Sequence, residues 1–153
     1  MSTSQTVGVI GAGTMGNGIA QTCAVAGIKA VMIDVSDAAL KKGTDTIAGS
    51  LERLVKKDKL AAADRDAALG RVSTTTDYAA LTGCDLVIEA ATENVALKIE
   101  ILRKVDALAK PEAIVATNTS SISITRLAAA TDRPEHFIGL HFMNPAPVME
   151  LVE

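Results

Sequence analysis

The chain has 153 residues and is 48% hydrophobic, which is enough for one domain with a buried core. A net charge of -3 and an aromatic content of 2% provide neither a basic surface nor a base-stacking surface, so we expect no nucleic-acid partner. No apolar run approaches the roughly 20 residues that span a bilayer, and residues 1–5 do not resemble a signal peptide. We therefore expect a cytoplasmic protein without membrane contact.

Short apolar runs alternate with helical patterns along the chain. The runs are Val7–Ile10, Ala30–Ile33, Leu86–Ile88 and Ala113–Ala116. This alternation predicts an α/β fold with a mainly parallel sheet covered by helices on both faces, because parallel strands need crossover connections. The first crossover is expected to be a helix over Met15–Ala26, ended by Gly27.

The remaining segments predict further helices and a late extended region. Residues 37 to about 70 are rich in Ala, Leu, Lys and Asp at helical spacing, and we expect two helices that form an excursion after the second strand. The other expected elements are a helix over Val95–Lys110 ended by Pro111, a helix over Ile124–Ala130, an extended segment over Phe137–Phe142, a turn at Pro145 and Pro147, and a last run over Val148–Glu153.

Two cysteines complete the general features of the sequence. Cys23 and Cys84 are far apart, form no CxxC pair, and each lies in an apolar segment. This placement favours reduced, buried thiols over a disulfide or a metal site. We expect no metal ion.

A glycine-rich loop follows the first expected strand and opens the first expected helix. Gly11 allows the tight turn, Gly13 lets the main chain approach a pyrophosphate, and Gly16 allows close helix–strand packing. The helix would offer its free N–H groups and positive dipole end to the phosphates. In this context GxGxxG predicts a doubly wound, Rossmann-type domain. The expected cofactor contacts are Gly11, Ala12, Gly13, Thr14, Met15 and Gly16.

Asp34 ends the second expected strand, 18 residues after Gly16. A carboxylate there can accept hydrogen bonds from the ribose hydroxyls of adenosine and would repel a 2′-phosphate, which predicts NAD over NADP. Lys41 and Lys42, about a turn later, weaken that preference. The alternative is that the glycines serve only tight packing and that Asp34 caps a helix.

Polar residues near the end of the chain suggest a reaction. In an open parallel sheet the ligand lies outside the carboxyl ends of the strands, where we expect Ser120, His141 and Asn144. A histidine can accept the proton of an alcohol while a nicotinamide takes the hydride. Glu153 is the candidate carboxylate partner of His141, because a turn at Pro145 to Pro147 could bring the two close together.

With these residues, the chain resembles the cofactor-binding half of L-3-hydroxyacyl-CoA dehydrogenases, in particular bacterial 3-hydroxybutyryl-CoA dehydrogenases. The resemblance runs from Val7 to the last residue. It is carried by the glycine loop Gly11–Gly16, the segment Glu89-Ala-Ala-Thr-Glu93, the segment Asn118-Thr-Ser-Ser121 and the segment His141-Phe-Met-Asn-Pro145.

The resemblance implies a role for each matching residue. His141 corresponds to the general base and Glu153 to its carboxylate partner, while Ser120 and Asn144 match substrate contacts. Glu93, Lys98 and Asn118 match positions that line the nicotinamide end of the NAD site, and Ser50 and Lys57 match contacts to coenzyme A. The basic run Lys56-Lys57-Asp-Lys59 suits the phosphates of coenzyme A.

Several of these residues have a structural alternative. His141 could be a hydrogen-bonded histidine at a strand end, and the lysines could form a solvated helix face. Glu93 and Lys98 could form a charge pair at a helix start, and Ser120 and Ser121 could cap the following helix.

The family also has an all-helical domain that contributes dimer contacts and part of the acyl-CoA pocket. Because this chain stops at Glu153, inside an expected strand, we expect residues 1–153 to be a truncated NAD-binding domain without that helical domain. The resemblance implies NAD-dependent oxidation of an L-3-hydroxyacyl-CoA by a homodimeric parent protein. It also implies that this chain binds NAD and turns over poorly. Two alternatives are a β-hydroxyacid dehydrogenase acting on a free acid with a catalytic lysine, and a stand-alone NAD-binding module.

Overall fold

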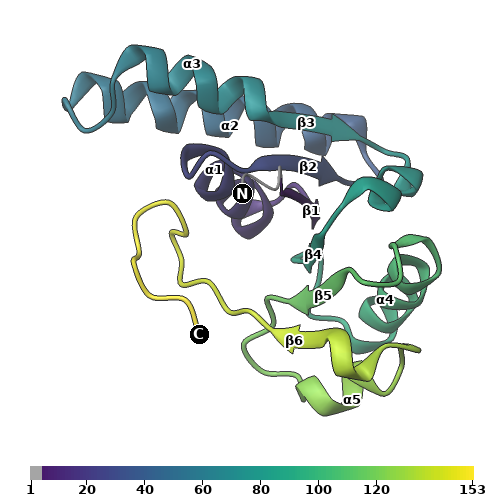
Figure 1. The fold of residues 1–153 in the computed structure, drawn as a ribbon. Coiled ribbons are helices and arrows are strands. Elements are labelled where there is room, and N and C mark those ends of the chain that lie inside the picture. Colours follow the sequence, from purple (N-terminus) through teal and green to yellow (C-terminus); the bar gives the residue numbers. More distant parts are fainter. Residues whose placement is uncertain (1–4) are drawn as a thin grey trace.

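The computed structural model describes residues 5–153 and contains one six-stranded parallel sheet in the order β3-β2-β1-β4-β5-β6 (Figure 1). The strands are β1 (Thr6–Ile10), β2 (Lys29–Ile33), β3 (Val72–Thr75), β4 (Leu86–Glu89), β5 (Ile114–Thr117) and β6 (Phe137–Gly139). The order reverses between β1 and β4, as in doubly wound sheets. The predicted fold class is therefore confirmed.

Helices cover both faces of the sheet. They are α1 (Thr14–Val25), α2 (Asp37–Lys56), α3 (Ala62–Arg71), α4 (Val95–Leu108) and α5 (Ile124–Ala128), with 3-10 turns η1 (Tyr78–Gly83) and η2 (Pro134–His136). Successive residues of β1 enter different cores: Val9 packs in a cluster with Ile47 of α2, and Ile10 packs with Leu102 of α4 and Leu127 of α5. This alternation explains why the strands read as continuous apolar runs.

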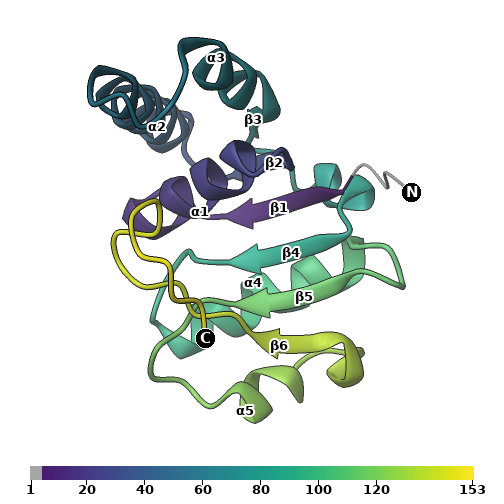
Figure 2. The same ribbon diagram turned by 60° about the vertical axis from the view of Figure 1, so that its left-hand side comes forward.

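The predicted excursion consists of the two helices α2 and α3, which lie side by side at one end of the molecule (Figures 1 and 2). The hydroxyl of Ser36 accepts a hydrogen bond from the backbone N–H of Ala39 and so caps α2. Near the tip, the guanidinium of Arg65 lies 2.6 Å from the carboxylate of Glu52. No helix within the described residues is long and apolar enough to cross a membrane.

The local structure differs from expectation in three places: one strand was missed, one expected strand is absent, and one suggested cap is wrong. The strand β3 was not predicted, because Val72-Ser-Thr-Thr75 is short and mostly polar and lies at the sheet edge. The last run, residues 148–153, forms no strand and makes one isolated antiparallel bridge, between Phe142 and Val152. The cap of α5 is Ser123, which accepts from the N–H of Arg126, and not the Ser120–Ser121 pair.

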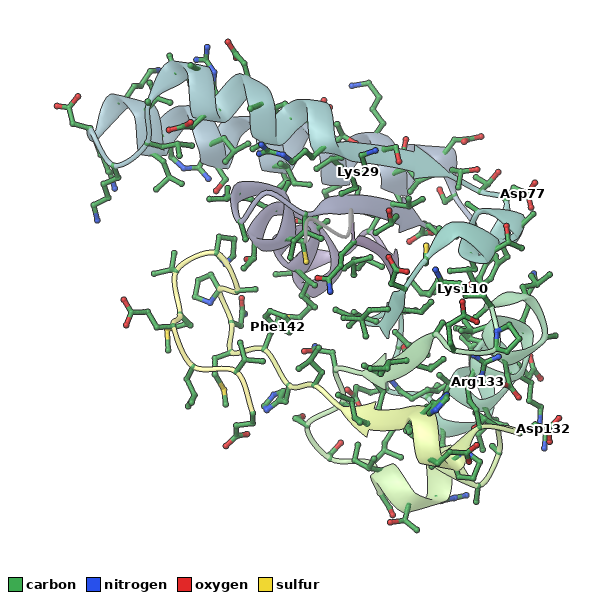
Figure 3. All side chains as sticks on the ribbon, viewed as in Figure 1. Lys29, Asp77, Lys110, Asp132, Arg133 and Phe142 are labelled. Atoms are coloured by element: carbon green, nitrogen blue, oxygen red, sulfur yellow. The ribbon has the colours of Figure 1, made fainter. Side chains whose placement is uncertain are left out.

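A buried arginine fixes the turn between α5 and β6 against α4 (Figure 3). The guanidinium of Arg133 lies 2.5 Å from the carboxylate of Asp106 and donates to the carbonyls of Asp106, Ala109, Lys110 and Ala113. The carbonyls of Asp106 and Ala109 lie in the last turn and at the C-cap of α4, where a helix leaves carbonyls without an internal partner, and those of Lys110 and Ala113 lie in the loop that leads to β5. These polar contacts therefore fix the turn between α5 and β6, which contains few apolar residues.

Candidate functional site

The three glycines of the loop have different steric surroundings. Gly11 has φ +102°, and a Cβ there would lie 2.8 Å from the carbonyl oxygen of Ala90. A Cβ on Gly16 would lie 1.8 Å from the carbonyl oxygen of Gly11. At Gly13 a Cβ would meet nothing within 4 Å, so this exposed position leaves open the space that a pyrophosphate needs. The loop therefore fits a dinucleotide.

Asp34 is joined to the glycine loop at the end of β2. Its Oδ2 accepts a hydrogen bond from the backbone N–H of Ala12 at 2.9 Å, and its Oδ1 accepts from the N–H of Ser36 at 3.1 Å. Because Ser36 supplies the cap of α2, the alternative of Asp34 as the helix cap is wrong. The carboxylate lines a cavity of about 220 Å³ that also includes Gly11, Val35, Tyr78, Leu97 and Ile101.

A second cavity, of about 290 Å³, lies at the other end of the glycine loop. Its lining includes Gly13, Thr14, Met15, Glu93, Lys98 and Asn118. Both cavities are also lined by Ala91 and Thr92, so together they form one surface across the carboxyl ends of β1, β2, β4 and β5. The apolar cavity beside Asp34 suits an adenosine, and the second cavity, where the polar side chains of Glu93, Lys98 and Asn118 join an apolar lining, suits a nicotinamide. The residues present thus fit NAD.

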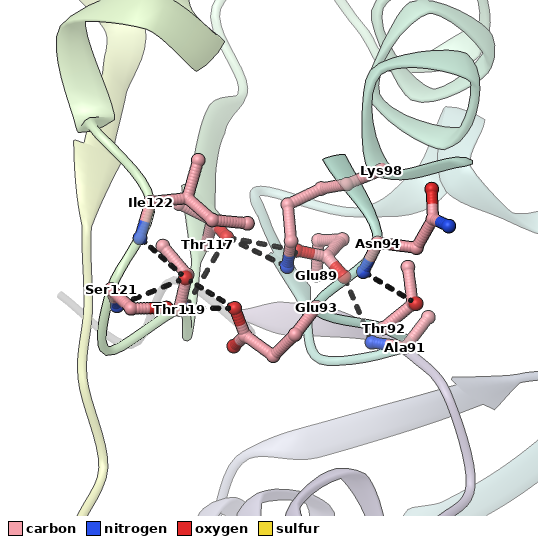
Figure 4. A network of polar contacts seen from close by, with 10 residues as sticks. All are labelled: Glu89, Ala91, Thr92, Glu93, Asn94, Lys98, Thr117, Thr119, Ser121 and Ile122. Carbon is pink, nitrogen blue, oxygen red and sulfur yellow. Dashed lines mark hydrogen bonds and ion pairs between the residues drawn. The ribbon is translucent and has the colours of Figure 1, made fainter. Parts of the chain in front are cut away.

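Lys98 belongs to a buried network centred on Glu89 (Figure 4). The side chains of Lys98 and Glu89 are 1% and 0% exposed, and the ammonium of Lys98 is paired with Oε1 of Glu89. The hydroxyl of Thr117 donates to the same oxygen at 2.8 Å. The predicted alternative of a surface pair between Glu93 and Lys98 is therefore wrong.

Glu93 is exposed and is held by the loop after β5. Its Oε2 accepts a hydrogen bond from the hydroxyl of Thr119 at 2.8 Å, and the hydroxyl of Ser121 lies 3.5 Å away (Figure 4). These contacts leave Glu93 at the rim of the second cavity. The loops after β4 and β5 are thereby tied together.

Asn118 follows β5 directly and connects the carboxyl ends of β4 and β5 with the segment after β6. Its backbone N–H donates to the carbonyl of Glu89 at 2.9 Å, and its side-chain carbonyl accepts from the backbone N–H of Phe142 at 2.8 Å. Asn118 thus fixes the segment after β6 against the second cavity, whose wall it also forms.

His141 and Glu153 lie close together, as the turn at Pro145 to Pro147 predicted. Nδ1 of His141 lies 3.1 Å from Oε2 of Glu153, and the two residues exchange backbone hydrogen bonds of 2.8 and 2.9 Å. The histidine side chain is 28% exposed and the glutamate 62%. A carboxylate at Nδ1 favours the tautomer in which Nε2 is free to accept a proton.

The other predicted substrate residues lie on two different parts of the chain. Ser120, in the loop after β5, and Asn144, after β6, are exposed, and neither side chain makes a hydrogen bond within residues 5–153. Ser50 lies on α2 and accepts from the amide of Gln21 at 2.9 Å, and Lys57 is exposed at the C-cap of α2. The excursion therefore carries Ser50 and Lys57, whereas Ser120 and Asn144 lie on loops beyond the strand ends.

Sequence reasoning missed the residues that support the site. Glu89, Thr117 and Thr119 are buried and hydrogen bonded to predicted site residues, and Tyr78 and Leu97 line the cavity beside Asp34. One signal was present in the sequence: Glu89 places a carboxylate at the end of an apolar strand, where a charge needs a partner. The described residues contain no cluster of three or more His, Cys, Asp or Glu side chains that could hold a metal ion.

The sheet order and the glycine loop at the start of α1 define a dinucleotide-binding Rossmann domain. A family model described as the NAD-binding domain of 3-hydroxyacyl-CoA dehydrogenase matches residues 6–153. The chain belongs to this family, and its cofactor is NAD.

Curated and structurally solved relatives agree with this assignment. A 3-hydroxybutyryl-CoA dehydrogenase of Bradyrhizobium diazoefficiens is 56% identical over 147 residues, covering 96% of this chain and 50% of the relative. A 3-hydroxyadipyl-CoA dehydrogenase of Escherichia coli is 46% identical, covering 97% of this chain and 31% of the relative. The crystal structure of (S)-3-hydroxybutyryl-CoA dehydrogenase from Ralstonia eutropha has a TM-score of 0.96 and 57% identity, covering 98% of this chain and 53% of that one. The chain thus spans about half the length of the first curated relatives it matches.

Proposed function

We propose that residues 1–153 form the NAD-binding domain of an enzyme that oxidises an L-3-hydroxyacyl-CoA to the 3-ketoacyl-CoA, with 3-hydroxybutyryl-CoA as the first substrate to test. Bound NAD would supply the hydride acceptor at its nicotinamide. Asp34 would accept hydrogen bonds from the ribose hydroxyls of the adenosine. Glu93, Lys98 and Asn118 would line the nicotinamide end of the site. The chemistry then needs one further group, a base for the hydroxyl proton.

The hydrogen-bonded pair of His141 and Glu153 is the observation that carries the proposal. With Nδ1 bonded to the carboxylate, Nε2 of His141 would take the proton of the 3-hydroxyl group as the hydride leaves. Glu153 would hold the imidazole ring in place and stabilise the imidazolium, as the aspartate carboxylate does in the Ser-His-Asp triads of hydrolases. Asn118 supports this arrangement, since it ties Phe142, the neighbour of His141, to the end of β5.

The substrate contacts are proposed from the family resemblance. Ser120 and Asn144 would contact the substrate near the reacting oxygen. Ser50 and Lys57 would contact coenzyme A, whose phosphates suit the exposed ammonium of Lys57. A homodimer and a cytoplasmic location are likewise proposals that follow from the resemblance.

A comparison of two proteins tests the function. The first is the 153-residue chain, and the second is a hybrid enzyme in which residues 6–153 replace the matched half of the Bradyrhizobium relative. We expect the chain alone to bind NAD in a calorimetric titration and to turn over poorly. We expect the hybrid enzyme to reduce NAD in the presence of (S)-3-hydroxybutyryl-CoA, followed by NADH absorbance, because productive alignment needs a substrate held on all sides.

The same measurements can overturn the proposal. A folded hybrid enzyme that binds NAD but oxidises no 3-hydroxyacyl-CoA of any chain length would contradict the reaction. It would favour a stand-alone NAD-binding module instead. Oxidation of free 3-hydroxybutyrate at a rate equal to that of its coenzyme A ester would contradict the substrate class.

A further inference from the structure

We infer that Glu89 is a positioning residue for the nicotinamide end of the site, acting through the ammonium of Lys98 and the backbone N–H of Ala91. The inference rests on the proposed function, since it takes the cavity lined by Lys98 and Asn118 as the nicotinamide end. It assigns Glu89 no contact with cofactor or substrate.

Both oxygens of the Glu89 carboxylate are used, and they hold different parts of the site (Figure 4). Oε1 accepts from Lys98 and from the hydroxyl of Thr117, whereas Oε2 accepts from the backbone N–H of Ala91 at 2.9 Å. The carboxylate is 0% exposed, so water does not satisfy it. One side chain therefore fixes a charged group from α4 and the turn that follows β4.

Glu89 provides the counter-charge of the buried Lys98 ammonium. A buried ammonium without a counter-charge is strongly disfavoured, and Glu89 is the carboxylate paired with it. An ammonium has three N–H donors, and those of Lys98 have two partners, Glu89 and, at 3.4 Å, the hydroxyl of Thr117. These contacts leave one donor of the ammonium without a partner within the described residues, and we take this donor to face the cavity that Lys98 lines.

Ala91 links the carboxylate to the glycine loop. A Cβ on Gly11 would lie 2.9 Å from the Cα of Ala91, so the turn after β4 and the loop after β1 are in close contact. The backbone N–H of Ala90 also donates to the carbonyl of Ile10 at 2.9 Å. Glu89 thus sits where the strand order reverses, the position at which doubly wound sheets bind their ligands.

The test compares two ligands that share the adenosine end of NAD. NAD carries the nicotinamide and ADP-ribose lacks it. We expect Glu89→Gln to weaken NAD binding by the 153-residue chain roughly ten- to a hundredfold, the range for a lost charged hydrogen bond, and to change ADP-ribose binding less than about twofold. If Glu89 acts largely through Lys98, Glu89→Gln should weaken NAD binding much less when it is added to Lys98→Met than when it is made alone, and any remaining loss would act through Ala91.

Two further variants complete the experiment. Asp85→Asn is the matched control, because Asp85 pairs with Lys110 at 2.5 Å just before the opposite end of the same strand, and it should leave both affinities unchanged. If Glu89→Gln does not fold, Thr117→Val can be used instead, because it removes one hydrogen-bond donor from the Glu89 carboxylate. This variant should lose less affinity for NAD and should keep its affinity for ADP-ribose.

The possible results separate this inference from the proposed function. Equal losses of affinity for NAD and ADP-ribose in Glu89→Gln would show that Glu89 has a purely structural role and would overturn the inference. Unchanged NAD affinity in Glu89→Gln would also overturn it, as would additive effects of Glu89→Gln and Lys98→Met. A wild-type chain that binds no NAD would instead overturn the proposed function.

Discussion

His141 and Glu153 are joined by both their side chains and their main chains: Nδ1 lies 3.1 Å from the carboxylate, and each backbone N–H donates to the carbonyl of the other residue. The main-chain pair brings the two side chains together without a regular strand. The orientation of the imidazole is therefore set by residues at the end of the described chain.

In the hybrid enzyme, His141→Gln should lower kcat about 10²- to 10⁴-fold, the usual contribution of a general base, with NAD affinity nearly unchanged. Glu153→Gln should lower kcat less, and adding it to His141→Gln should cost nothing more, because the carboxylate acts through the histidine. His136→Gln is the control, since Nδ1 of His136 faces the carbonyl of Pro111 at 3.4 Å. Steady-state kinetics of the four variants would show whether His141 is the base. Normal turnover of His141→Gln would remove this residue from the mechanism.

Alanine at two glycines should separate binding from folding. Gly13→Ala meets no atom within 4 Å, so the free energy of unfolding should hold while NAD affinity falls, because the new methyl group occupies the path of the pyrophosphate. Gly16→Ala places its Cβ 1.8 Å from the carbonyl of Gly11 and should lower the free energy of unfolding by about 1–3 kcal/mol or more. Urea unfolding and NAD titration measure both effects. Undiminished NAD binding by Gly13→Ala would contradict the assigned path.

Asp34→Asn should narrow the preference for NAD over NADP, because the neutral amide no longer repels a 2′-phosphate. NAD affinity should also fall, by roughly tenfold or more, since charged hydrogen bonds to the ribose and to the N–H of Ala12 are weakened. Calorimetric titration with both cofactors measures the change. Asp37→Asn, an exposed carboxylate in the first turn of α2, is the matched control and should not alter the ratio.

The two thiols should be unreactive in the folded chain. Burial raises the pKa of Cys23 to about 11, and burial also raises the pKa of Cys84. At pH 8 only about one Cys23 in a thousand would be a thiolate, so alkylation by iodoacetamide should be far slower than in urea. Cys84 is buried, as expected, whereas Cys23 is only partly buried. Mass spectrometry of the alkylated chain measures the reaction, and rapid modification of either cysteine without denaturant would contradict the raised pKa values.

The same pKa predicts an effect on stability at high pH. The pKa of Cys23 in the folded chain lies above its ordinary value of 9.0, so its contribution to stability is complete below pH 9 and is lost as the pH rises through about 11. Urea unfolding between pH 8 and 11 should therefore show a smaller decline for Cys23→Ala than for the wild type. Equal declines would show that Cys23 is not the group responsible.

Much of the fold could be predicted because local patterns determine it. Apolar runs gave four of the six strands within about a residue of their observed ends, and the spacing of apolar residues gave the two helices of the excursion. The strand β3 was missed because an edge strand pairs on one side only and has little need of apolar residues. The expected strand over residues 148–153 failed because nothing within the described residues pairs with it beyond one bridge.

The sequence alone determined the glycine loop, the carboxylate at Asp34 and the residue types of the His141–Glu153 pair, because each depends on short spacing or on a known motif. Only the tertiary structure decided which side chains pair with each other in the buried part of the site. Glu89 and Lys98 are nine residues apart, and Glu89 and Thr117 are 28 apart, and only the pairing of β4 with β5 and the packing of α4 bring them together. Buried charges are satisfied by whatever the fold places beside them, and no local pattern shows which residue that is.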